Sequence, residues 1–336
     1  MTLWKYLARR LFFVVPQLIG ITFVTFLLIQ IIPGDPARLM LGPLASENTI
    51  HLLREHMGLN RPFPTQYGLY VWHAMQGDFG SSWQSGNPVA ADLRQRLPAT
   101  LELITYSLML AVLIAIPLGV RAARKPGKVS DRFAFGYGLV AGALPEFWLG
   151  LILILVIYVK LGWGVSPDGR LDVGVSAPTR ITGAYTIDAL VTGNWLALKS
   201  AFQHLALPVA TLTITTIGPI LKMTRSTMQQ MLASDFTRYA RLCGLPDKLV
   251  GRYALRNALP PIVTLVAVLY SFLIGGAVLV EFVFGWGGAG QYAVQGVLNA
   301  DFQVVQGFVL VAAVISLVVY LLVDLIYFAI DPRLTR

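Results

Sequence analysis

The chain has 336 residues, of which 56% are hydrophobic and only 13% are Asp, Glu, Lys or Arg, and its mean hydropathy is +0.66. Ordinary soluble domains carry roughly a quarter charged residues, so a water-soluble surface is excluded and lipid must cover much of the apolar side chain. The single cysteine, Cys243, excludes an intramolecular disulfide, and the net charge of +9 is interpreted only after the basic residues are located.

The first predicted element is a membrane span at residues 11–32, which hold no charged side chain over 22 positions. At 1.5 Å per residue this run crosses a hydrocarbon core of roughly 30 Å. Basic residues before it are also typical of a secretory signal. The run is long for such a signal, however, and no small-residue cleavage site follows it. A retained span is therefore predicted.

Five further apolar runs predict an all-α polytopic membrane protein with six spans. They lie at residues 103–120, 133–159, 205–221, 262–280 and 304–322. Prolines inside or at the ends of the runs predict kinks that a helix bundle in lipid tolerates, at Pro16, Pro117, Pro145, Pro208 and Pro219.

Two long polar segments, residues 33–102 and 160–204, are predicted as ordered structure outside the membrane. The first contains an amphipathic helix at residues 47–57, followed by Gly58 and turn residues at 60–64. The second is rich in Gly and Pro, which favours loop or short strand over helix.

The distribution of charge predicts that both termini face the cytoplasm. In that orientation the inward segments are residues 1–10, 121–132, 222–261 and 331–336, which hold 17 of the 26 Lys and Arg residues and 4 of the 17 Asp and Glu residues. Basic residues concentrate on the cytoplasmic side of membrane proteins. The positive charge therefore needs no nucleic-acid partner.

Catalytic and metal-binding motifs are missing from the sequence. Gly127-Lys128 is not part of a phosphate-binding loop, and H-E-x-x-H, C-x-x-C and G-x-S-x-G do not occur. His51 and His56 are five residues apart, a spacing that does not bring both rings to one helical face for a metal. The sequence predicts a non-catalytic chain that binds no metal or cofactor itself.

Two acidic residues in or beside apolar runs are candidates for lining a pathway. An uncompensated charge at the bilayer centre costs about 2.5 to 3.5 kcal/mol, so each should face a cavity, a partner or an interface. Glu281 lies near a span end, where snorkelling or helix capping also explains it. Glu146 lies nearer mid-span, directly after Pro145, where a broken helix could line a pathway.

The basic loop at residues 222–261 is predicted as a helix, a break and a second helix. Ser234 or Asp235 caps the first helix, Gly244 ends it, and Pro246 lies in the first turn of the second. The result is a short helix lying across the cytoplasmic face. Two interpretations stay open on these residues: a contact for a partner protein, and a helix held by its arginines to anionic lipid.

This loop resembles the cytoplasmic coupling motif of the dipeptide, oligopeptide and nickel permeases of ABC importers. Ala240, Gly244 and the Ala-Leu-Arg-Asn-Ala run at residues 254–258 match that motif. Further blocks that resemble the family occur in family order along nearly the whole chain, at residues 31–37, 58–67, 77–82, 98–103, 204–208, 281–290 and 331–335.

The chain departs from the family pattern in three respects. Gly287-Gly288-Ala289-Gly290 stands where the family has Pro-Gly-Leu-Gly, and Tyr253 stands where His is usual. The stretch between Gly244 and residue 254 is also one residue short. The departures at Tyr253 and in this spacing bear on which ATPase the loop accepts, and the one at residues 287–290 bears on the rigidity of a tight turn.

The resemblance implies the type I ABC importer permease fold. Residues 1–100 would hold the first span and first periplasmic region, and 101–336 a five-helix core with a periplasmic insertion at 160–204 and the coupling loop at 222–261. The chain would be an inner-membrane permease with a second homologous permease, two ATPase subunits that bind ATP and Mg, and a periplasmic binding protein delivering peptides or a related solute. The alternative is a secondary transporter driven by an ion gradient.

The resemblance also assigns ATPase coupling to residues around the break in the loop. Leu245, Pro246 and Leu249 are expected to make the apolar contact, and Arg241, Asp247 and Lys248 its polar rim. The complete predicted coupling set is Ala240, Arg241, Gly244, Leu245, Pro246, Asp247, Lys248, Leu249, Arg256 and Asn257.

Overall fold

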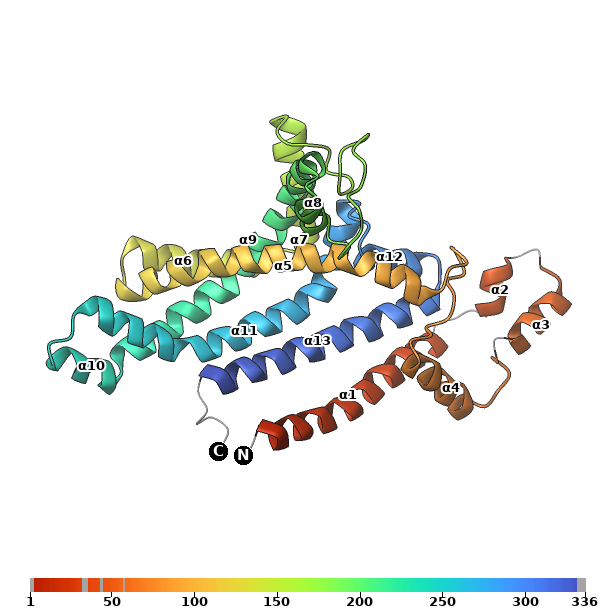
Figure 1. The fold of residues 1–336 in the computed structure, drawn as a ribbon, viewed down its shortest axis with the longest axis horizontal. Coiled ribbons are helices and arrows are strands. Elements are labelled where there is room, and N and C mark those ends of the chain that lie inside the picture. Colours follow the sequence, from red (N-terminus) through yellow and green to blue (C-terminus); the bar gives the residue numbers. More distant parts are fainter. Residues whose placement is uncertain (1–2, 32–35, 43–44, 57, 331–336) are drawn as a thin grey trace. The chain divides into compact units, whose positions relative to one another are not determined.

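The structure is a computed structural model that describes residues 3–31, 36–42, 45–56 and 58–330. The family-like tail at 331–335, part of the block at 31–37 and residue 57 lie outside this range. The described residues form helices and no β-strand, which confirms the predicted all-α class (Figure 1). They form two compact units, Met1–Leu97 with Gly288–Leu317, and Pro98–Gly287 with Val318–Arg336.

The first unit contains four helices from the N-terminal part of the chain and a short helix from the C-terminal part. In chain order these are α1 (Leu3–Ile31), α2 (Pro36–Leu41), α3 (Glu47–His56), α4 (Phe63–Met75) and α12 (Ala289–Leu298). The start of α5 (Val89–Arg124) and most of α13 (Phe302–Ile330) complete it. Helix α3 confirms the predicted amphipathic helix, whereas α4 was not predicted.

Helix α4 packs against α1 through aromatic rings. The ring of Phe26 lies 5.3 Å from that of Phe63 and 5.7 Å from that of Tyr70, measured between centroids. The hydroxyls of Thr22 and Tyr67 are 3.0 Å apart. Aromatic side chains contribute large buried areas, so this cluster anchors the segment that follows the first predicted span.

Two buried carboxylates organise the rest of the first unit. Asp301 accepts hydrogen bonds from the Ser82 hydroxyl at 2.7 Å and the Trp83 backbone N–H at 2.8 Å. Asp92 accepts one from the Tyr292 hydroxyl at 3.0 Å. The family-like block at residues 77–82 is thus tied to residues more than 200 positions away.

The second unit is built around α9 (Trp195–Ala233), which packs against α6 (Val129–Ala141), α7 (Glu146–Leu153) and α11 (Asp247–Val283). Gly218 of α9 faces Gly138 of α6, whose Cα lies 3.6 Å from the position a Cβ on Gly218 would take. Small residues therefore let these two helix backbones approach closely, as they do in membrane bundles.

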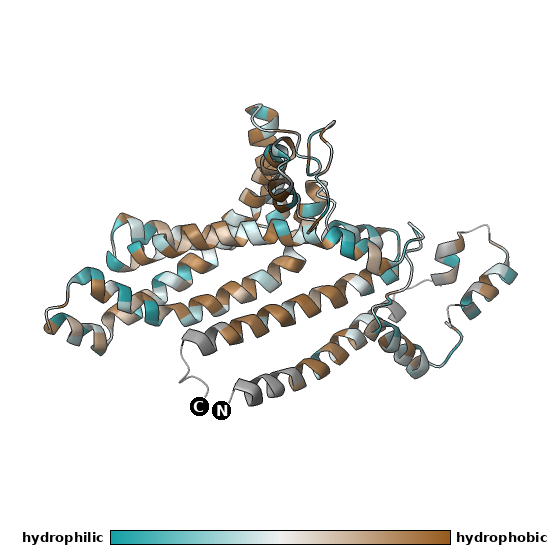
Figure 2. Ribbon diagram, viewed as in Figure 1, coloured by the Kyte–Doolittle hydropathy of each residue, from teal (hydrophilic) through white to brown (hydrophobic). Residues whose placement is uncertain are grey.

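Four described helices are long and apolar enough to cross a bilayer: Val89–Arg124, Trp195–Ala233, Asp247–Val283 and Phe302–Val323. A fifth span results if α6 and the helices after it are counted together, and Phe12–Leu27 of α1 is a shorter apolar helix. In Figure 2 the hydrophobic residues follow the middle of α11 and α13, and hydrophilic residues gather around α10. The count of six spans stays a prediction.

The predicted span at residues 133–159 is broken. Helix α6 ends at Ala141, α7 begins at Glu146 after Pro145, and a π-helical turn follows at Ile154–Lys160. The two parts are bent by 102°. Pro145 has no backbone N–H to donate to the preceding turn, and it disfavours a helical backbone at the residue before it, which explains the break. The prediction of a broken helix before Glu146 is confirmed.

The segment at residues 160–204 is only partly the loop that its glycines predicted. Residues 161–184 hold no helix, but α8 (Tyr185–Thr192) and the first ten residues of α9 are helical. The prediction was wrong for residues 185–204. The glycines on which it rested lie at or before Gly183, and residues 185–204 contain one glycine, Gly193. Gly193 ends α8 in the left-handed conformation, with φ at 68°.

A buried ion pair attaches this segment to α5. Arg170 donates to Glu102 at 2.6 Å, and the side chains are 12% and 1% exposed. The backbone N–H of Thr186 donates to the other Glu102 oxygen at 2.8 Å, and the guanidinium of Arg170 lies over the ring of Tyr185. The Glu102 carboxylate thus accepts from one charged and one neutral donor, and these interactions offset the free-energy cost of burying its charge.

Candidate functional site

The first candidate site is the turn that joins α9, α10 (Asp235–Leu242) and α11. Ser234 ends α9 and precedes α10 with an extended backbone. The buried hydroxyl of Thr237 lies 2.8 Å from the Met231 and Ser234 carbonyl oxygens and 3.1 Å from that of Leu232. Thr237 therefore fixes α10 to the end of α9.

Gly244 makes the reversal between α10 and α11 possible. Its φ is +78°, a conformation that costs a residue with a Cβ about 1 kcal/mol or more. Gly244 donates to the Arg241 carbonyl at 2.9 Å, and Leu245 donates to the Ala240 carbonyl at 3.1 Å, which closes the helix end. The predicted helix, break and helix are confirmed.

The second helix differs from its prediction. A short transverse helix was expected after Pro246, but α11 runs without a break from Asp247 to Val283, through Pro260 and Pro261. The short helix is α10. The two prolines are accommodated inside α11 rather than ending it, as membrane helices allow when neighbouring groups satisfy the freed carbonyls.

Most of the predicted coupling residues lie around this turn, whereas Arg256 and Asn257 lie further along α11. The ion pair between Arg241 Nε and Asp247 Oδ1 spans it at 3.6 Å, with side chains 50% and 91% exposed, so it contributes little to stability. Leu245 and Leu249 are half-buried. The remaining members of the predicted set that are exposed are Gly244, Pro246, Lys248, Arg256 and Asn257.

Sequence reasoning missed an apolar surface on α10. Phe236, Tyr239 and Leu242 are 40%, 70% and 78% exposed, and they recur every third residue on one broad face of the helix. Their spacing within residues 235–242 was the available signal. Together with Pro246, they give the turn an apolar surface bordered by basic side chains, which suits a protein partner better than water.

Behind the turn, α11 is seated on α5 and α9 by small residues. Ala254, Ala258 and Ile262 of α11 form one buried cluster with Ala123 of α5 and Met228 of α9. No loop interrupts α11 between the turn and this cluster, so the two are joined by one continuous helix.

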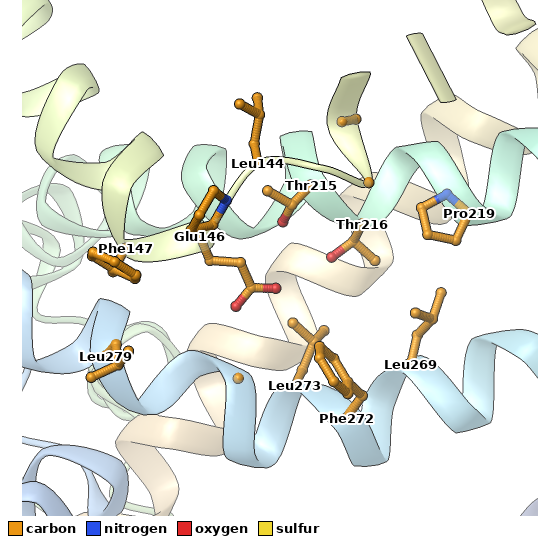
Figure 3. A pocket seen from close by; sticks show the side chains of 14 residues that line it. Leu144, Glu146, Phe147, Thr215, Thr216, Pro219, Leu269, Phe272, Leu273 and Leu279 are labelled. Carbon is orange, nitrogen blue, oxygen red and sulfur yellow. The ribbon is translucent and has the colours of Figure 1, made fainter. Parts of the chain in front are cut away.

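The second candidate site is a cavity of about 360 Å³ beside the break between α6 and α7 (Figure 3). Residues of α9 and α11 complete its wall. It is lined by Ala141, Gly142, Leu144, Pro145, Glu146, Phe147, Thr215, Thr216, Pro219, Leu269, Phe272, Leu273, Gly276 and Leu279.

Glu146 carries the only ionisable side chain of this lining. Its carboxylate points into the cavity from the first residue of α7 (Figure 3). Thr215 of α9 is also part of the lining, and its hydroxyl donates to the Leu212 carbonyl at 3.0 Å. A Cβ on Gly276 would lie 3.1 Å from Glu146 Oε2, so this glycine leaves the carboxylate its space.

The structure does not bring the second acidic candidate to the cavity. Glu281 lies near the end of α11, is fully buried, and is not part of the lining. Its backbone carbonyl accepts a hydrogen bond from the Trp286 N–H at 2.9 Å. Glu146 and Glu281 therefore belong to different environments.

An ion pair that the sequence did not predict joins α6 to α9. Asp131 at the start of α6 accepts from Arg225 Nε and, at 2.9 Å, from the Gly127 backbone N–H. Ninety-four positions separate Asp131 from Arg225, so no local pattern indicates the contact.

Two family descriptions match the sequence. Residues 115–336 match the binding-protein-dependent transport system inner membrane component, and residues 3–104 match the N-terminal part of the membrane component of such systems. The matched ranges include both the cavity and the turn at Gly244.

Individual relatives match along their whole length. The probable D,D-dipeptide transport system permease protein of Escherichia coli strain K12 is 40% identical over 100% of this chain and 99% of its own. The dipeptide transport system permease protein of the same strain is 37% identical over 98% of both chains. The glutathione transport system permease protein of Salmonella paratyphi A is 33% identical over 98% of both.

Proposed function

Because the chain belongs to the family of inner membrane components of binding-protein-dependent transport systems, we propose that it forms half of the solute pathway of an ATP-driven importer. A second homologous permease forms the other half. The chain is a non-catalytic, multi-pass permease subunit, and a substrate-binding protein and separate ATPase subunits belong to such a system. A secondary transporter driven by an ion gradient finds no support among the relatives.

The proposed topology has six spans, both termini in the cytoplasm and the turn at Gly244 on the cytoplasmic side. The four long apolar helices, the bent pair and the shorter helix in α1 support the count. The excess of Lys and Arg in the proposed inward segments supports the orientation. Residues 33–102 and 160–204 are then the periplasmic insertions.

The proposed cargo is a peptide. Relatives named as dipeptide and D,D-dipeptide permeases at 37% and 40% identity support this class, and the glutathione permease has a peptide-like cargo. We place the cavity beside Glu146 in the proposed pathway. The bend between α6 and α7 brings a carboxylate into a space between helices, where a purely structural contact would be apolar.

The proposed contact for the ATPase is the apolar surface of α10 with the turn from Ala240 to Leu249. Continuity of α11 from this surface to Val283 is the observation that carries the proposal. ATP and Mg bind to the ATPase subunits, and their closure would reach the pathway through α11 as a rigid-body shift of a packed helix. An apolar surface bordered by basic residues suits such a docking site.

Cys243 offers a direct test, because it is the only cysteine of the chain, it is exposed, and it lies in the turn beside Gly244. We expect a maleimide photo-crosslinker on Cys243 of the assembled complex to form an adduct with an ATPase subunit. The same labelled chain, purified in detergent without ATPase subunits, should form no such adduct. Adducts with lipid alone in the full complex would contradict the proposal and favour a membrane-surface helix.

A further inference from the structure

We propose that the Glu146 carboxylate and the cavity around it form a cation subsite that receives the ammonium group of the solute during passage. This inference rests on the proposed function, since it assigns chemistry to a point on the proposed pathway. The ligand class is a small solute with a protonated amine.

The first argument is the way the backbone presents the carboxylate. Pro145 holds an extended backbone with φ at −63° and ψ at 129°, and the chain turns by 102° before α7 begins. Glu146 is therefore at the first turn of a new helix, where the helix dipole favours a negative charge. In Figure 3 the carboxylate lies between the helices that carry Thr215 and Leu273.

The second argument is the balance of charge. None of the fourteen lining residues is Lys, Arg or His, and the two threonine hydroxyls of the lining, those of Thr215 and Thr216, both donate to the Leu212 carbonyl. By contrast, the buried Glu102 is paired with Arg170. A carboxylate among apolar side chains is costly without a counter-charge, so an entering cation gains from a site whose described lining supplies none.

The third argument is the size and chemistry of the walls. A volume of about 360 Å³ suits a small solute, since ligand sites span about 300–1,000 Å³. Phe147 and Phe272, 39% and 64% exposed, add aromatic rings to the lining, and ring faces attract cations. Gly276 keeps one wall free of side chain next to Glu146 Oε2.

The test measures local electrostatic potential rather than transport. In a Cys243→Ser background, Phe272→Cys places one thiol in the cavity wall, one helical turn from Gly276. The probes are two methanethiosulfonates of similar size, one with a trimethylammonium group and one with a sulfonate group. Their reaction rates with Cys at position 272 are compared in the complex assembled with its permease and ATPase partners.

We expect the ratio of the cationic to the anionic rate to fall about tenfold when Glu146 is changed to Gln, because one unit charge a few ångströms away acts on the two probes in opposite directions. Glu146→Asp, which keeps the charge, should retain most of the ratio. Glu281→Gln removes a carboxylate outside the cavity and should leave the ratio unchanged.

Two results would overturn the inference. One is a thiol that reacts with both probes at a ratio unaffected by Glu146→Gln, which refutes the cation subsite and leaves the pathway and the ATPase contact standing. The other is a thiol that reacts with neither probe, with or without ATP, which means that the cavity is closed by a partner chain. Failure of the Cys243 crosslink, by comparison, refutes the coupling contact alone.

Discussion

At the scale of single residues, the polar contacts that fix the second outer segment link positions far apart in the chain. Glu102 meets Arg170 across 68 positions and Thr186 across 84. The polar composition of residues 160–204 predicted that they lie outside the membrane. The periodic spacing of hydrophobic residues, however, reports only on local helix or strand and gives no information about such distant pairs. Their partners follow only from the folded path of the chain.

Asp188 gives this segment a specific dependence on pH. It is buried and accepts hydrogen bonds from the backbone N–H groups of Thr182 at 2.7 Å and Gly183 at 2.8 Å. Burial by itself would raise the pKa of Asp188, but these hydrogen bonds and that of the Thr182 hydroxyl outweigh it and hold the pKa below its usual range.

A carboxylate with a lowered folded pKa stabilises the fold above its unfolded pKa of about 3.9, and that contribution disappears as the pH falls through the folded pKa. We therefore expect the segment to resist limited proteolysis equally from pH 8 to pH 5 and to lose resistance only below about pH 4. Asp188→Asn should weaken it by about 1–3 kcal/mol from pH 8 to pH 5, where the carboxylate is ionised, because buried donors lose part of their acceptor, and the difference from the unsubstituted chain should shrink below about pH 4.

Asp172→Asn is the matched control, because this carboxylate lies in the same segment with its side chain 42% exposed. A much smaller effect on proteolysis is expected there. A transition centred near pH 6, or equal effects of the two substitutions, would contradict the role given to Asp188.

At the scale of elements, the apolar runs predicted where helices cross the membrane but not how far they extend. The run at residues 205–221 became the 39-residue α9, and 262–280 became the 37-residue α11. Polar flanks carry little hydropathy signal, and Pro260-Pro261 indicates a helix end in a soluble protein. Packing of Ala254 and Ala258 against α5 and α9 keeps the helix continuous there.

The glycine turn before α11 can be tested against a second turn with the same backbone. Gly244 and Gly127 have φ at 78° and 76°, and a Cβ would meet no atom within 4 Å at either position. A residue with a Cβ at either site therefore adds similar backbone strain, and the Cβ itself meets no neighbour. Only Gly244 lies in the proposed ATPase contact.

We expect Gly244→Val to lower ATP-dependent uptake and substrate-stimulated ATP hydrolysis by tenfold or more, with normal abundance in the membrane. Gly127→Val should keep most of both activities. Uptake in vesicles and ATPase assays on the purified complex provide the measurement. Equal losses in the two variants would mean that strain, rather than a lost contact, is responsible.

At the scale of the whole molecule, many large apolar side chains face outward, and the membrane accounts for them. Within its apolar window α9 is 67% buried, whereas the window in α13 is 11% buried. Helix α9 is therefore the centre of its unit, whereas little of the apolar window of α13 is covered by the chain itself. The composition alone predicted that lipid covers the apolar surface, and the burial of each helix shows that α9 is the central one.

The same substitution at two exposed valines of the second unit should have different effects on the interaction with the binding protein. Val173 lies in the proposed periplasmic insertion and is fully exposed, and Val129 lies at the start of α6 and is 83% exposed. We expect Val173→Asp to raise, by about tenfold, the concentration of loaded binding protein that half-maximally stimulates ATP hydrolysis, because a charge in a contact surface must be desolvated. Val129→Asp should leave that concentration unchanged.

Unstimulated ATP hydrolysis checks that both variants assemble, and it should match the unsubstituted complex. A shift of similar size for Val129→Asp, or none for Val173→Asp, would remove this part of the insertion from the contact with the binding protein.

The unbroken length of α11 has a mechanical consequence. From Asp247 to Gly276 the helix rises by about 44 Å at 1.5 Å per residue. A tilt of only about 5° at the turn would displace the backbone opposite Glu146 by about 4 Å, more than the radius of a water molecule. If ATPase closure tilts α11 as proposed, a small movement at the turn would become a larger one at the cavity wall, and the space beside the Glu146 carboxylate would open and close with each cycle.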